Sequence, residues 1–161
     1  MLSIEQHIDR HAQNAPERVA MVLNGEELTY AELRQRTMLR AQHYQGMQRK
    51  GVVLRAKCDA DFLISYFAVH VAGAVAVLLP AVATPEQTVR MEKALQGFDF
   101  PEGSADVLFT TGTTGTPKGV VIGTQAITAS AENIVHGQAY RHDIRFVVPG
   151  QLNHLGCLSK V

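Results

Sequence analysis

The segment from Thr110 to Gly119 concentrates residue types that bind anions. It reads Thr-Thr-Gly-Thr-Thr-Gly-Thr-Pro-Lys-Gly and follows a short run, 106–109, that we expect to form a buried strand. Glycines permit positive φ angles, so consecutive backbone N–H groups can turn toward one anion. Threonine hydroxyls supply further hydrogen-bond donors, and the ammonium group of Lys118 supplies a positive charge. The segment therefore predicts a binding site for a triphosphate.

Two other nucleotide-binding patterns do not fit this segment. A P-loop requires Gly-x-x-x-x-Gly-Lys followed by serine or threonine. Counted from Gly112, Pro117 replaces the second glycine and Gly119 replaces the hydroxyl residue. The dinucleotide-binding pattern Gly-x-Gly-x-x-Gly is also absent. Composition alone leaves one alternative open, which is a Gly/Thr-rich surface loop that binds no ligand.

Apolar spacing and turn residues predict alternating strands and helices along the rest of the chain. The expected strands cover 18–24, 26–30, 51–56, 74–79, 106–109, 120–122 and 145–148, and the expected helices begin near Ile4, Tyr30, Phe62, Pro85 and Thr124. Asn24-Gly25 indicates a tight hairpin turn, and Thr29 with Glu32 forms a capping-box pattern at a helix start. This alternation is typical of the α/β class, with a layered open, largely parallel sheet and helices on both faces.

The composition is that of an ordinary globular domain. A chain of 161 residues that is 46% hydrophobic and 19% charged can bury one core. Its 15 basic residues balance its 15 acidic ones, which argues against nucleic-acid binding. Polar residues, glycine and proline interrupt the longest apolar stretch, 62–82, so we expect a buried helix and strand there and no membrane span. With no signal-peptide pattern and only two cysteines, we expect a cytoplasmic protein without a disulfide framework or a zinc site.

The order of residues at 109–120, Phe-Thr-Thr-Gly-Thr-Thr-Gly-Thr-Pro-Lys-Gly-Val, closely resembles the phosphate-binding signature of the adenylate-forming (AMP-binding) superfamily. That superfamily includes acyl-CoA synthetases, the adenylation domains of peptide synthetases, and luciferases. The family usually has serine where this chain has Thr111, so a hydroxyl is kept. Further stretches similar to family segments are 14–20 and 28–33 (the opening), 67–77 (a buried helix–glycine–strand unit) and 126–135 (the helix after the loop). Within 67–77, His70 stands at a position that is not usually histidine.

The resemblance implies an AMP-forming acid–thiol ligase of the acyl-CoA synthetase type. In such enzymes a carboxylate attacks the α-phosphorus of ATP, pyrophosphate leaves, and a thiol then displaces AMP from the acyl-adenylate. Donors arranged around the β- and γ-phosphates stabilise the charge that develops on pyrophosphate. By resemblance these donors belong to Thr110, Thr111, Gly112, Thr113, Thr114, Gly115, Thr116 and Lys118. The implied ligands are ATP, Mg²⁺, a small carboxylic acid, and the thiol of coenzyme A or of a carrier protein.

A second, weaker match lies at 148–156. It is placed like the family's Pro-Leu-Phe-His segment, which lines the acyl pocket, but Asn153 stands where the family has an aromatic residue. His154 and Gly156 are therefore candidate pocket residues, and a helix-capping or core role for His154 is an equal alternative. The remaining histidines show no metal-ligand spacing, and we assign no role to His7, His11, His43, His70, His136 and His142.

The resemblance covers nearly the whole chain but not the whole of a family member. The stretch 80–105 is shorter than in most members, which indicates a compact variant. The chain reaches Val161 before the segments that carry the family's adenine contacts, acidic metal ligand, hinge and C-terminal catalytic lysine. We expect residues 1–161 to be a partial N-terminal domain without the C-terminal lid domain, and without a complete catalytic set. The alternatives are a catalytically incomplete remnant that binds a nucleotide or a partner, and an adenylation domain that loads a carrier protein.

Overall fold

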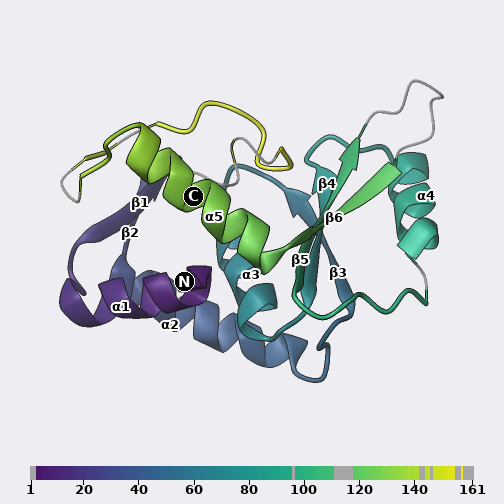
Figure 1. The fold of residues 1–161 in the computed structure, drawn as a ribbon, viewed down its shortest axis with the longest axis horizontal. Helices are drawn as coiled ribbons and strands as arrows, with labels where there is room; N and C mark the ends of the chain where they lie inside the picture. Colours follow the sequence, from purple (N-terminus) through teal and green to yellow (C-terminus); the bar gives the residue numbers. More distant parts are fainter. Residues whose placement is uncertain are drawn as a thin grey trace.

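A four-stranded sheet forms the centre of the structure (Figure 1). The computed structural model describes residues 3–95, 97–110, 118–141, 144–145, 147–154 and 157. The strands are β3 (Gly51–Ala56), β4 (Val75–Pro80), β5 (Ser104–Thr110) and β6 (Lys118–Gly123), in the order β3-β4-β5-β6. The first three are parallel, and β6 runs antiparallel to β5. The predicted largely parallel sheet is confirmed.

Helices cover both faces of this sheet, as predicted (Figure 1). Helix α3 (Ala60–Val71) packs on one face, and the smaller α4 (Pro85–Leu95) lies on the other. On the α3 side, the chain adds α1 (Ile4–Asn14), the hairpin β1 (Val19–Leu23) and β2 (Glu26–Thr29), α2 (Tyr30–Ala41) and the short 3₁₀ helix η1 (Gln42–Tyr44). Helix α5 (Thr124–Gly137) crosses from the end of β6 toward the hairpin.

Short-range contacts explain where several of these elements begin. At the β1–β2 turn, Asn24 and Gly25 both have positive φ angles, 53° and 83°, which a tight hairpin requires. The predicted capping box at α2 is present, because the Thr29 hydroxyl accepts from the Glu32 N–H and the Glu32 carboxylate accepts from the Thr29 N–H. Asp59 caps α3 in a similar way by accepting from the N–H of Phe62 at 2.8 Å. The two helix caps join residues three positions apart, and the turn depends on two adjacent residues, so the sequence alone indicates all three features.

The main core lies between α3 and the sheet. Helix α3 is buried on nearly all sides, and the first five residues of β4 are fully buried. Phe67, Tyr66 and Leu78 are each at most 2% exposed. A smaller cluster under α4 packs Phe100 against Val77 and other strand residues. Within the described ranges, no helix is long and apolar enough to cross a membrane.

One expected element is not found. A strand was predicted at 145–148, but the described residues of that stretch, Arg145, Val147 and Val148, have no strand conformation. A strand requires a neighbour that takes up its backbone hydrogen bonds. The described strand pairings supply no such neighbour for this segment, so an apolar run alone was an insufficient signal.

Candidate phosphate-binding site

The β5–β6 hairpin carries the Gly/Thr-rich segment. Strand β5 ends at Thr110 and β6 begins at Lys118, and these two residues are paired across the antiparallel ladder. The predicted ligand-binding residues Thr111, Gly112, Thr113, Thr114, Gly115 and Thr116 lie between them, outside the described residues. The structure therefore describes the two supports of the candidate site and not the loop itself.

Thr110 and Lys118 project their side chains from the same face of the β5–β6 ladder. Residues directly opposite each other in an antiparallel ladder project their side chains from the same face of the sheet. The Thr110 hydroxyl donates to the backbone carbonyl of Lys118 at 3.5 Å, and both residues are exposed. Among the described residues, Lys118 forms no ion pair.

The base of the hairpin is firmly held. Residues 105–108 of β5 are buried, and β5 pairs on its other side with β4. Gly119 belongs to this packing, because a Cβ atom there would lie 3.1 Å from Cγ1 of Val107 and 3.4 Å from the ring of Phe109. The glycine that ends the signature thus has a packing role in β6, because a side chain at this position would be crowded by Val107 and Phe109.

The second predicted site is only partly described. His154 is exposed, which excludes the alternative of a core histidine, whereas its neighbours Leu152 and Asn153 are buried. Its backbone carbonyl accepts from the N–H of Cys157 at 3.0 Å. Gly156 lies outside the described residues. The assignment of His154 and Gly156 to a substrate pocket stays a prediction.

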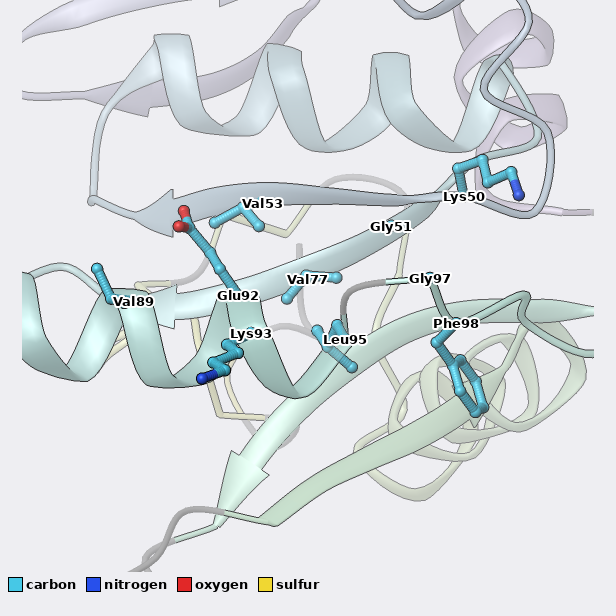
Figure 2. Close-up of a pocket in the computed structure, with 10 residues that line it drawn as sticks. All are labelled: Lys50, Gly51, Val53, Val77, Val89, Glu92, Lys93, Leu95, Gly97 and Phe98. Atoms are coloured by element: carbon cyan, nitrogen blue, oxygen red, sulfur yellow. The ribbon is translucent and has the colours of Figure 1, made fainter.

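A pocket of about 700 Å³ lies away from the hairpin, between α4 and the edge strand β3 (Figure 2). Val53 and Val77 form its floor on the sheet, and Val89, Leu95 and Phe98 form the opposite side. The charged groups at this pocket are those of Lys50, Glu92 and Lys93. Neither Thr110 nor Lys118 lines this pocket. In the described part of the chain, no group of three or more His, Cys, Asp or Glu side chains is arranged to hold a metal ion.

The structure reveals a buried charged cluster that the sequence hypothesis did not assign. His70 on α3 lies between two carboxylates: its Nε2 is 2.9 Å from Oδ1 of Asp106 on β5, and its Nδ1 is 3.3 Å from Oε1 of Glu5 on α1. The hydroxyl of Tyr66, one turn earlier on α3, donates to the other oxygen of Asp106 at 3.0 Å. A signal was present in the sequence, because His70 and Asp106 are polar residues on two elements that were expected to be buried.

The cluster shifts the pKa values of its members. Burial by itself lowers the pKa of His70, but hydrogen bonds and attraction to Asp106 and Glu5 outweigh burial and raise that pKa to about 9. Burial raises the pKa of Glu5, and contacts with His70 and Ser3 reverse this, so that the pKa lies below its ordinary value. Burial and the neighbouring Asp106 carboxylate hold the pKa of Tyr66 well above its ordinary value.

The fold of this chain is similar to that of part of several solved structures. O-succinylbenzoate coenzyme A synthetase (MenE) from Bacillus subtilis, solved with AMP, matches 98% of this chain with a TM-score of 0.80 at 20% identity. The N-terminal subdomain of NpsA from Klebsiella oxytoca, solved with 3-hydroxyanthranilyl-AMSN, matches 81% of it with a TM-score of 0.70 at 19% identity. In sequence, nonribosomal peptide synthetase acrB from Aspergillus aculeatus is 26% identical over 76% of this chain. No model of a known protein family matches the chain.

The lengths of these proteins differ from that of this chain. The chain spans 52% of the MenE structure and 43% of the NpsA structure. It spans 10% of the peptide synthetase. The similarity therefore concerns about half of each solved structure. It shows that this chain has the fold of that half.

Proposed function

We propose that this chain supplies the ATP phosphate-binding hairpin of an AMP-forming ligase that activates a carboxylic acid. The observation that carries the proposal is the pairing of Thr110 with Lys118 where the antiparallel strands β5 and β6 meet the Gly/Thr-rich segment. This pairing places a hydroxyl and an ammonium group on one face, at both ends of a segment whose glycines and threonines supply further donors. A triphosphate fits this set of donors, because it offers several anionic oxygens within a short span.

The proposed chemistry follows from where charge develops. When a carboxylate attacks the α-phosphorus of ATP, the bond to the β,γ-pyrophosphate breaks and negative charge accumulates on the leaving group. The Lys118 ammonium and the hydroxyls and N–H groups of the loop would stabilise that charge without reorganising. Mg²⁺ would neutralise phosphate oxygens when it binds with ATP. In support, a MenE structure with the same fold was solved with ATP and magnesium ion.

Replacement of Lys118 by alanine tests the site directly. We expect Lys118→Ala to weaken the binding of both ATP and inorganic pyrophosphate by about tenfold, because one charge-assisted hydrogen bond is lost. Isothermal titration calorimetry on the native chain and the variant measures this change. Lys93→Ala is the matched control, since it removes an exposed lysine that lines the pocket under α4. Equal binding by native and Lys118→Ala chains would show that Lys118 is not part of the site. Weaker binding by Lys93→Ala alone would show that the ligand binds at the α4 pocket.

The chain by itself should not complete the reaction. We propose that residues 1–161 are a partial N-terminal domain, and the share of about half of each solved structure supports this. We therefore expect no carboxylate-dependent exchange of labelled pyrophosphate into ATP when the isolated chain is assayed with Mg²⁺ and a panel of carboxylic acids. Exchange above the level of a denatured sample would show that the chain holds a complete adenylation site.

The thiol that accepts the acyl group has two candidates. Coenzyme A is favoured by the likeness to a coenzyme A synthetase, and a carrier-protein thiol is favoured by the likeness to a nonribosomal peptide synthetase. Mass spectrometry of the products of an enzyme that contains this segment would distinguish acyl-coenzyme A from an acylated carrier protein.

A further inference from the structure

Hydrogen-bonding chemistry sets the protonation state of His70. A neutral imidazole has one N–H donor and one acceptor nitrogen, whereas an imidazolium has two donors. Both ring nitrogens of His70 face carboxylate oxygens, at 2.9 Å for Asp106 and 3.3 Å for Glu5. An ionised carboxylate only accepts hydrogen bonds, so a neutral ring would place one bare nitrogen against an anionic oxygen.

Among the described residues, the ring nitrogens of His70 have no polar partner besides these two carboxylates. The side chain of His70 is 5% exposed, that of Glu5 is 19% exposed, and that of Asp106 is inaccessible to solvent. The second oxygen of Asp106 is already occupied by the Tyr66 hydroxyl, whose ring lies 4.5 Å from the imidazole. In the described ranges, the titratable groups that face His70 are therefore Glu5 from α1, Asp106 from β5 and Tyr66 from α3 itself.

The other described side-chain contacts of α1 are one buried apolar residue, an exposed ion pair and an aromatic stack. Ile8 is its one buried residue among those whose burial is described. Asp9 forms an ion pair with Arg34 of α2, but both side chains are almost half exposed, and exposed pairs of this kind contribute little. The ring of His11 stacks on that of Tyr30, with 4.8 Å between the two ring centroids. The contact from Glu5 to His70 is the charged contact of α1 that water screens least.

We infer that His70 is protonated on both ring nitrogens and acts as a buried ionic clasp that fastens α1 to α3 and β5. Removal of the proton leaves at most one of the two carboxylates with a donor. Asp106 is the more deeply buried partner and is closer to the ring, so the neutral ring keeps its N–H toward Asp106 and Glu5 loses its donor. The attachment of α1 is then sensitive to alkaline conditions, whereas α3 and the sheet remain packed through their apolar core.

Proton–nitrogen NMR of histidine-labelled native chain tests the protonation state. We expect the His70 ring to show two protonated nitrogens at neutral pH and to lose one proton as the pH rises through about 9. The Glu5→Gln variant assigns the signal, because the ring that faces residue 5 is the one whose resonances move. A His70 ring with one unprotonated nitrogen at neutral pH would overturn the inference.

Amide hydrogen exchange tests the attachment of α1. Glu5→Gln and Asp9→Asn each replace one carboxylate of α1 by an amide of the same shape, which makes them a matched pair. We expect Glu5→Gln to lower the protection factors of α1 amides by about tenfold or more relative to those of α3, and Asp9→Asn to change them less than threefold. Equal losses in the two variants, or no loss in Glu5→Gln, would show that the clasp does not hold α1.

Discussion

Replacement of His70 by leucine should lower the free energy of unfolding by about 3–5 kcal/mol. The physical reason is the buried carboxylate that remains, because Asp106 has no exposed surface and would keep only the Tyr66 hydroxyl as a partner. Urea unfolding followed by far-UV circular dichroism measures the change, and circular dichroism is the suitable probe because the chain contains no tryptophan.

Two controls separate the buried charge from the general effect of losing a histidine. His43→Leu removes an exposed histidine and should change the free energy of unfolding by less than about 0.5 kcal/mol. The double variant His70→Leu/Asp106→Leu should be more stable than His70→Leu alone, since it removes the unpaired charge together with its partner. If the double variant were the less stable of the two, an unpaired Asp106 would not be the source of the loss.

Raising the pH from about 6.5 to about 10 should cost the native chain about 3 kcal/mol of stability through His70 alone. The pKa of His70 is raised in the folded state from its ordinary 6.5 to about 9. The folded chain therefore binds a proton more tightly than the unfolded chain does. The extra stability is fully present below about pH 6.5, and it is lost as the pH rises through about 9.

The contribution of Glu5 to the free energy of unfolding depends on pH in the opposite direction to that of His70. Its pKa is lowered in the folded state, so its contribution is present above its ordinary pKa of 4.5 and is lost on acidification. Urea unfolding at a series of pH values should thus show greatest stability between about pH 5 and 6.5 and a decline on the alkaline side. The alkaline decline should be absent from His70→Leu/Asp106→Leu. A decline of equal size in the double variant would assign it to other groups.

Local chemistry made much of the fold predictable. The hairpin at Asn24-Gly25 and the capping box of Thr29 with Glu32 depend on contacts within a few residues, and both are confirmed. The helix-then-strand interpretation of 62–82 is confirmed as α3 followed by β4. The fold class followed from the alternation of such elements, and the structural comparisons support it.

Long-range pairing was harder to predict. His70 and Asp106 are 36 positions apart, and Glu5 belongs to a third element. No periodic pattern in the sequence therefore predicts that these three side chains are in contact. The strand expected at 145–148 shows the same difficulty, because an apolar run forms a strand only when another strand pairs with it. For the phosphate site, the order of residues predicted a phosphate-binding role for 110–116 and Lys118, and that role stays a prediction. The antiparallel pairing of Thr110 with Lys118 depends on contacts between two strands and was not predicted.

The position of β6 in the sheet has a consequence for the behaviour of the chain in solution. Strand β6 is the last strand in the order β3-β4-β5-β6, and Val120 and Val121 are 46% and 42% exposed. Along its outer side, no described strand takes up its backbone N–H and C=O groups. An uncovered edge with apolar side chains is a template for any other strand that reaches it. A strand that paired with this edge, from another copy of the chain or from another segment, would take up these backbone groups.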